Sequence, residues 1–172
     1  MGKLKDKLVA SGIPNINWVW TAVSQEDTFR YFLDKIKPKK VLEIGTFNGV
    51  STALLAEYAD VVHTVDILEQ PWMTNAVWTH CGCKDKVKSY IVKSTKKKRE
   101  LIASLDFDFA YIDGSHLEEN ILVDFDVAKK CKRMLFHDYW KRENDWDDVR
   151  YFIDGLDGYN KEILEPFAYV SK

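Results

Sequence analysis

Three short stretches carry residue types that could bind a ligand or do chemistry. The first covers residues 43–49 and reads Glu-Ile-Gly-Thr-Phe-Asn-Gly. The others are residues 113–116, Asp-Gly-Ser-His, and residues 137–139, His-Asp-Tyr. Glycine lets the backbone turn sharply and approach a ligand, since no Cβ stands in the way. Carboxylates and imidazoles can bind a divalent cation or move a proton.

The first stretch has the spacing of a loop that binds a nucleoside without phosphate groups. Asp66 lies 21 residues after Gly45, where a ribose-binding carboxylate is expected in a strand–helix–strand unit. The pattern Glu-x-Gly-x-x-x-Gly lacks the middle glycine that admits a pyrophosphate, and no Gly-Lys-Ser/Thr sequence is present. S-adenosylmethionine, which has an adenosine ribose and no phosphate, is the common ligand with these features.

The elements that must position these residues follow from the apolar pattern. Short runs rich in β-branched or aromatic residues predict strands over 40–45, 61–66, 87–92, 107–113 and 133–138. Helical spacing of apolar residues predicts helices over 28–36, 50–58 and 118–130. This alternation predicts a parallel sheet with helices on both faces. Beyond residue 138 we expect a helix over 146–156 and a hairpin-like edge from strands at 162–164 and 167–170.

The predicted fold class is α/β, a three-layer α/β/α sandwich with a Rossmann-like, mostly parallel sheet and an antiparallel edge strand. The 172-residue chain has no repeat and no Pro/Gly/Ser-rich linker. We therefore expect one domain over residues 1–172, with an N-terminal helical segment over 1–38 and the core over 39–172.

Charge and composition argue against several classes of partner. The net charge of −2 and the pI near 6.1 argue against bulk electrostatic binding to nucleic acid or anionic lipid. The basic cluster at residues 96–99 is interpreted as the solvated start of a helix, and the alternative of a contact patch for an acidic acceptor stays open. No apolar run approaches the ~20 residues that span a bilayer, and no signal peptide is evident. Three cysteines are too few for a disulfide scaffold, which favours a cytoplasmic location.

The three stretches, in this order, resemble a known family. Residues 41–52, Val-Leu-Glu-Ile-Gly-Thr-Phe-Asn-Gly-Val-Ser-Thr, are similar to the first motif of class I S-adenosylmethionine-dependent methyltransferases. They most resemble the small-molecule O-methyltransferase branch with the catechol, caffeoyl-CoA and macrocin enzymes, and residues 113–116 and 137–139 resemble later motifs of that branch. The resemblance implies that Gly45 and its neighbours meet the methionine moiety, Asp66 the ribose, and Ser94 the adenine. The expected cofactor-binding set is Glu43, Gly45, Thr46, Phe47, Asn48, Gly49, Asp66, Ser94 and Asp113.

Two aspartates at predicted strand ends indicate a metal site. If the strands that end at Asp113 and Asp138 are neighbours, ~4.8 Å apart, both carboxylates point into one crevice. A divalent cation there would bind acceptor oxygens and lower their pKa, and the resemblance supports it, since several relatives hold magnesium at these points. His137 stands where some relatives carry an acidic residue. The resulting set of Asp113, His137 and Asp138 contains both oxygen and nitrogen ligands, so it would accept Mg²⁺ or another divalent cation. His137 and Asp138 reach one ion only if the strand ends at His137, and the sequence leaves open whether an ion binds.

His116 is the candidate general base, because an imidazole can take a proton from a hydroxyl near neutral pH. In macrocin-like relatives a histidine of this motif is thought to play that part; the alternative is that His116 caps the following helix. Trp140 could form a wall of an acceptor pocket.

The predicted function is methyl transfer from S-adenosylmethionine to a hydroxyl of a small molecule, a sugar or a phenol. Two alternatives stay open: a non-catalytic S-adenosylmethionine-binding module or partner subunit, and a nicotinamide-dependent oxidoreductase. The acidic balance counts against nucleic acid as the acceptor. Whether the chain forms a homo-oligomer also stays open.

Overall fold

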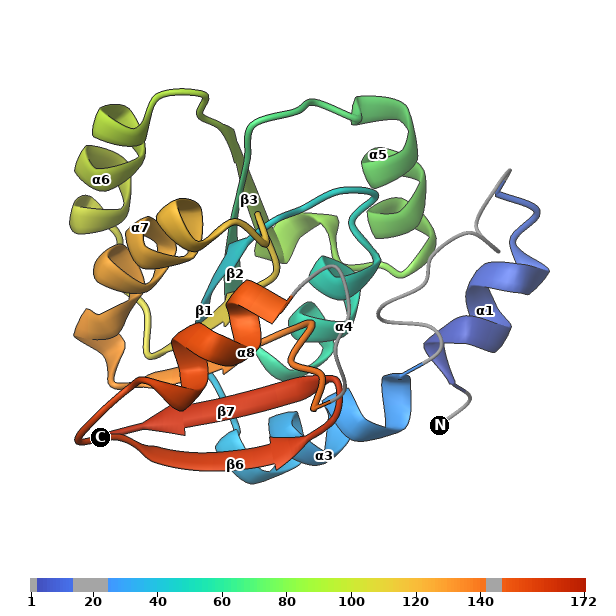
Figure 1. Cartoon of the computed structure of the whole chain (residues 1–172). Coiled ribbons are helices and arrows are strands. Elements are labelled where there is room, and N and C mark those ends of the chain that lie inside the picture. The colour runs from blue at the N-terminus through green and yellow to red at the C-terminus, as the bar shows by residue number, and fades with distance from the viewer. Residues whose placement is uncertain (1–2, 14–24, 142–146) are drawn as a thin grey trace.

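A seven-stranded sheet runs through the centre of the computed structural model, which describes residues 3–13, 25–141 and 147–172 (Figure 1). The strand order is β3-β2-β1-β4-β5-β7-β6. The first five strands pair in parallel, whereas β7 is antiparallel to both of its neighbours. The strands are β1 (Lys40–Ile44), β2 (Val61–Asp66), β3 (Val87–Ile91), β4 (Phe109–Ile112), β5 (Arg133–Phe136), β6 (Asn160–Leu164) and β7 (Phe167–Ser171).

Helices cover both faces of the sheet, which confirms the three-layer prediction (Figure 1). Side chains of β1 alternate between two cores, with Val41 on one face and Leu42 and Ile44 on the other, as the two-residue period of a strand requires. One layer holds α1 (Leu4–Ala10), α3 (Glu26–Ile36), α4 (Val50–Tyr58) and α5 (Pro71–His80). The other holds α6 (Thr95–Ser104), α7 (Glu118–Ala128) and α8 (Asp147–Asp154).

Most predicted elements form, and the largest differences lie at their ends. The predicted helix over 50–58 and strand over 61–66 have the bounds of α4 and β2. The helix predicted over 118–130 ends at Ala128 and continues as a 3₁₀ turn, Lys129–Cys131. The strand predicted over 133–138 is two residues too long, because β5 ends at Phe136 and Asp138 has a left-handed φ of 61°.

Three helices, α1, α5 and α6, were not predicted with bounds, and the last two share a weak apolar pattern. In α5 only Thr74, Val77 and Trp78 are buried, and in α6 only Ile102, so neither shows a repeating apolar stripe. The basic cluster does lie at the start of α6, as interpreted. A second 3₁₀ turn, Lys84–Lys86, leads from the end of α5 into β3.

The two last strands form the predicted hairpin at the edge of the sheet. The antiparallel strand β7 lies inside this hairpin, between β5 and the edge strand β6. Phe167 of β7 is buried against Phe29 of α3, with ring centroids 5.1 Å apart. Tyr31 of α3 donates a hydrogen bond to Glu162 of β6 at 2.8 Å, so the first helix layer holds the hairpin in place.

None of the helices in the described part of the chain is long and apolar enough to cross a membrane.

Candidate active site

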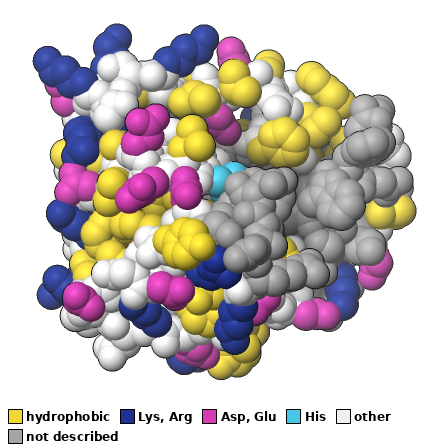
Figure 2. All heavy atoms as spheres, viewed as in Figure 1, with side chains coloured by type: hydrophobic (Ala, Val, Ile, Leu, Met, Phe, Trp, Pro, Cys, Tyr) yellow, Lys and Arg dark blue, Asp and Glu magenta, His cyan; other side chains and the backbone are white. Residues whose placement is uncertain are grey.

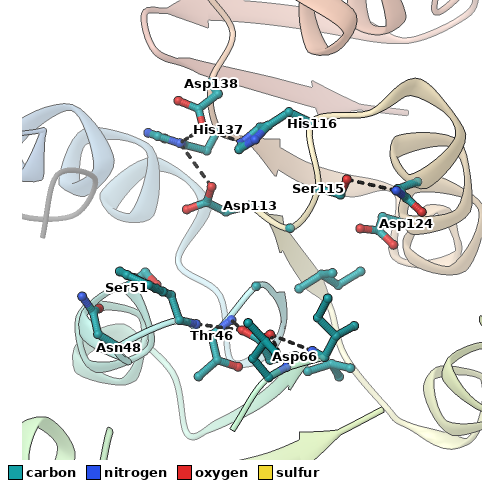
Figure 3. Close-up of a pocket in the computed structure, with 18 of the residues that line it drawn as sticks. Thr46, Asn48, Ser51, Asp66, Asp113, Ser115, His116, Asp124, His137 and Asp138 are labelled. Carbon is teal, nitrogen blue, oxygen red and sulfur yellow. Dashed lines mark hydrogen bonds and ion pairs between the residues drawn. The ribbon is translucent and has the colours of Figure 1, made fainter. Parts of the chain in front are cut away.

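A cavity of about 800 Å³ opens at the carboxyl ends of β1, β2, β4 and β5, and Figure 3 shows its polar side chains. Loops that follow parallel strands meet at this edge of a doubly wound sheet, which is where such folds bind ligands. Its lining includes Gln25, Gly45, Thr46, Phe47, Asn48, Asp66, Ile67, Leu68, Val92, Lys98, Asp113, Gly114, Ser115, His116, Asp124, His137, Asp138 and Trp140.

Asp66 lies in the cavity wall as predicted, and its carboxylate holds the surrounding backbone. Oδ2 accepts hydrogen bonds from the backbone N–H groups of Thr46 and Phe47, both at 2.8 Å. Oδ1 accepts from the N–H groups of Ile67 and Leu68, at 2.6 and 2.9 Å. Asp66 therefore fixes the loop after β1 to the loop after β2, a role that its ribose-binding prediction did not include.

The two glycines of the first motif have different reasons for being glycine. Gly45 has φ 100°, and a Cβ there would lie 2.0 Å from the carbonyl oxygen of Asp113. Gly49 has φ 81°, and its Cβ would lie 2.6 Å from Nε1 of Trp78, which donates a hydrogen bond to the Gly49 carbonyl at 2.9 Å. Gly45 lines the cavity, but Gly49 is packed against α5 and does not.

Glu43 lies behind the cavity and does not line it. Its side chain is fully buried beside α4, where Thr52 donates a hydrogen bond to Oε2 at 2.5 Å, and Oε1 has no hydrogen-bond partner among the described residues. Burial raises the pKa of Glu43 to about 7. Because Glu43 is not part of the cavity wall, its predicted contact with the cofactor stays a prediction.

The middle residues of the motif do line the cavity. Thr46 is buried, and its hydroxyl lies 2.6 Å from that of Thr64. Asn48 is buried beside it, whereas the Phe47 side chain is 62% exposed at the cavity mouth. Ser94 lies outside this cavity, at the N-cap position of α6, so the structure does not bring it together with the other predicted cofactor residues.

The three predicted metal ligands converge in one cluster. Nδ1 of His137 lies 3.3 Å from Oδ1 of Asp113 and 2.9 Å from Oδ2 of Asp138. Because β5 ends at Phe136, His137 and Asp138 are not constrained to opposite faces, and the condition set by the sequence is met. Tyr111 is fully buried and donates a hydrogen bond to Oδ2 of Asp113 at 2.9 Å, which orients that carboxylate.

Two carboxylates near Nδ1 of His137 favour a positive charge at that atom. Nε2 of His137 lies 2.7 Å from the side-chain oxygen of Gln25, so Nε2 carries the proton in that contact. Nδ1 then faces two carboxylates, and it makes no contact of hydrogen-bond geometry among the described residues. Burial disfavours the charged imidazole, but Asp113 and Asp138 outweigh it and raise the pKa of His137 to about 9. The pKa of Asp138 is lowered, since the close contacts with the two histidines and their charge outweigh its burial.

His116 joins this cluster from the loop after β4. Its Nε2 lies 2.7 Å from Oδ2 of Asp138 (Figure 3). Donor atoms of Asp113, His116 and Asp138 all lie within 4.8 Å of one another, so these three residues could hold a metal ion. The sequence named His116 only as a base or a helix cap. Its sharing of Asp138 with His137 arises from two loops that meet at adjacent strand ends.

Gln25 and Asp124 line the cavity and were not singled out by the sequence. Gln25 precedes α3 and Asp124 lies on α7, and no local pattern marks either residue. Lys98 of α6 also lines the cavity and belongs to the basic cluster at residues 96–99. The expected wall residue Trp140 does line the cavity.

Comparison with known proteins places the chain in the family that its motifs resemble. Residues 42–139, more than half of the chain, match a family described as a methyltransferase domain. The fold is similar to that of an O-methyltransferase from Bacillus cereus in complex with S-adenosylhomocysteine, with 17% identity, a TM-score of 0.71, and coverage of 99% of this chain and 90% of the other. The fold is also similar to that of a methyltransferase from Podospora anserina bound to S-adenosylhomocysteine. The sequence identity is 15% and the TM-score 0.70, and the match covers 99% of this chain and 88% of the other.

MycE, a methyltransferase of mycinamycin biosynthesis in complex with Mg, S-adenosylhomocysteine and mycinamycin VI, is similar over 99% of this chain and 53% of its own, with 15% identity and a TM-score of 0.63. A search of curated proteins finds no match to the chain. The family match over the region that builds the cavity, together with the strand order, shows that this chain belongs to the methyltransferase domain family.

Proposed function

We propose that this protein transfers a methyl group from S-adenosylmethionine to a hydroxyl of a small molecule, a sugar or a phenol. One observation carries the proposal: a single cavity joins the loop after β1 and Asp66 to the cluster of Asp113, His116 and Asp138. A cofactor bound along the loop can therefore present its methyl group to an acceptor held beside an imidazole and two carboxylates. Pockets for small ligands measure about 300–1,000 Å³, so a cavity of about 800 Å³ suits a cofactor and part of an acceptor.

The reaction is an in-line displacement. The acceptor oxygen forms a bond to the methyl carbon, the bond between that carbon and the sulfonium sulfur breaks, and S-adenosylhomocysteine leaves with the electron pair on sulfur. The hydroxyl proton goes to His116, and the carboxylate of Asp138, 2.7 Å from His116, stabilises the imidazolium that forms. Most of the remaining rate gain comes from holding the two reactants in line.

We further propose that the transfer is metal-assisted. The donor set fits a divalent cation because donor atoms of Asp113 and Asp138 lie within 4.8 Å of each other, and Nδ1 of His137 lies 3.3 Å from the first carboxylate and 2.9 Å from the second. Asp113, His137 and Asp138 would hold the ion, which leaves His116 as the base, and a mixed oxygen and nitrogen set accepts Mn²⁺, Fe²⁺ or Zn²⁺ as well as Mg²⁺. A bound ion would lower the pKa of the acceptor hydroxyl.

Calorimetric titration with S-adenosylhomocysteine, with NAD as a control, tests the cofactor. We expect micromolar binding of S-adenosylhomocysteine and none of NAD. Preferential binding of NAD would contradict the proposal and favour an oxidoreductase. A screen of sugar and phenol acceptors follows, and cofactor binding without turnover across that screen would favour the non-catalytic module.

Chelation tests the metal. The methyl-transfer rate is measured for protein treated with EDTA and again after Mg²⁺ or Mn²⁺ is restored. We expect the rate to fall on chelation and to recover with the ion. An unchanged rate would contradict metal assistance and would leave the protonated His137 as the positive charge between the two carboxylates.

A further inference from the structure

A buried ion pair forms a wall of the cavity away from the cluster of Asp113, His116 and Asp138. Lys98 of α6 and Asp124 of α7 form a salt bridge, and their side chains are 15% and 3% exposed. Both line the cavity. Figure 3 shows Asp124 on the far side of Ser115 from His116. Lys98 belongs to the basic cluster that the sequence reads as solvated, and for this lysine that interpretation is wrong.

The pair keeps hydrogen-bonding capacity that no described residue uses. Oδ1 of Asp124 accepts from Lys98, and neither side chain has another hydrogen-bond partner in the described part of the chain. A carboxylate offers about four acceptor sites and an ammonium three N–H groups, so acceptor and donor positions remain side by side. Because both side chains line the cavity, these positions face the space that a ligand would occupy.

Gly114 leaves Asp124 accessible from the loop after β4. Its φ is not in the left-handed region, so its backbone does not require glycine. A Cβ at Gly114 would nevertheless lie 3.0 Å from Oδ2 of Asp124 and 3.3 Å from a methyl carbon of Ile44. The missing side chain therefore keeps the space in front of Oδ2 clear.

We propose that Lys98 and Asp124 recognise the edge of the cofactor's adenine. Asp124 accepts a hydrogen bond from the 6-amino group, and Lys98 donates one to the neighbouring ring nitrogen. The adenine edge presents such a donor and acceptor next to each other. The inference rests on the proposed function, because the reacting methyl group must lie at the cluster with His116, which leaves the purine for a wall away from it. Ile67, Leu68 and Val92 supply apolar surface for the faces of the ring.

Ligand analogues test the proposal on the unaltered protein. Dissociation constants are measured by calorimetry for S-adenosylhomocysteine, for S-inosylhomocysteine, in which an oxygen replaces the amino group, and for the N6,N6-dimethyl analogue, which has no N–H there. We expect both analogues to bind about tenfold or more weakly, since a hydrogen bond to a buried charge is lost. Equal binding of all three ligands would overturn the inference and leave the proposed function intact. Failure of S-adenosylhomocysteine itself to bind would overturn the proposed function first.

Matched variants test whether the Lys98–Asp124 pair causes the preference for S-adenosylhomocysteine over its analogues. Asp124→Asn is expected to reduce the preference for S-adenosylhomocysteine over S-inosylhomocysteine, because an amide can also donate to the 6-oxygen. Asp126→Asn is the control, since Asp126 pairs with Arg99 between the same two helices and does not line the cavity. Circular dichroism checks that each variant folds. A wild-type preference in folded Asp124→Asn would overturn the inference, and if that variant does not fold, the analogue series on the wild-type protein decides.

Discussion

At the scale of single residues, the candidate site depends on a few side chains that face several partners at once. Asp138 lies 2.7 Å from Nε2 of His116 and 2.9 Å from Nδ1 of His137. Asp66 accepts hydrogen bonds from the backbone of two loops. Each carboxylate thereby joins segments that are distant in the chain, so the geometry of the site follows from where the loops meet.

His116→Ala tests the general base. We expect kcat for methyl transfer to fall about 10²–10⁴-fold, the usual contribution of a positioned base, with the dissociation constant for S-adenosylhomocysteine unchanged. Steady-state kinetics and calorimetry measure the two quantities. The control is His80→Gln, because His80 is an exposed histidine outside the cavity. A proportional loss of cofactor affinity in His116→Ala would contradict a role confined to proton transfer.

Glu43 predicts a pH dependence of stability. Burial raises its pKa in the folded state from the ordinary 4.5 to about 7, so the folded protein holds a proton that the unfolded chain has lost. The resulting stability is fully present below about pH 4.5 and is lost as the pH rises through about 7. We expect Glu43→Gln to gain about 2–3 kcal/mol of unfolding free energy relative to wild type between pH 5 and pH 8, measured by urea denaturation. Glu100→Gln, an exposed control, should show no such change, and a constant difference for Glu43→Gln would refute the prediction.

At the scale of elements, the loop from β1 to α4 is held by α5. Gly49 is the N-cap of α4, and Trp78 of α5 contacts it closely enough to leave no space for a Cβ. Gly49, whose contact with the cofactor stays a prediction, therefore packs directly against α5. This contact ties the loop after β1 to the first helix layer.

Gly49→Ala and Gly82→Ala separate backbone strain from steric clash. Both glycines have positive φ, 81° and 66°, but only the new Cβ at residue 49 would meet Trp78. We expect Gly82→Ala to lose about 1–2 kcal/mol of unfolding free energy from strain alone, and Gly49→Ala to lose more. Chemical denaturation measures both. Equal losses would show that Trp78 moves aside without cost.

At the scale of the whole molecule, the cavity exists only because the strand order brings distant loops to one edge of the sheet. The order places β4 between β1 and β5, so the loops that begin at residues 45, 113 and 137 lie next to each other. The face seen in Figure 2 shows charged side chains of both signs mixed with hydrophobic ones over the described residues.

Ligand binding should stabilise the folded protein as a unit. At 100 times the dissociation constant, S-adenosylhomocysteine is expected to add about 2.7 kcal/mol of unfolding free energy. For a chain of 172 residues this raises Tm by about 5–10 °C. Differential scanning fluorimetry with S-adenosylhomocysteine, and with NAD as the control, measures the shift. An equal shift with NAD would count against a phosphate-free nucleoside site.

The fold class, the five parallel strands and the terminal hairpin could be predicted from the sequence, because apolar periodicity is a local pattern. The family was expected from the resemblance of residues 41–52, 113–116 and 137–139 to its motifs. Only the fold shows that the cavity lining does not include Glu43, Gly49 or Ser94, and that His116 shares Asp138 with His137. It also brought Lys98 to Asp124. The reason is that each of these contacts joins elements far apart in the chain, and no spacing along one element records which loop meets which.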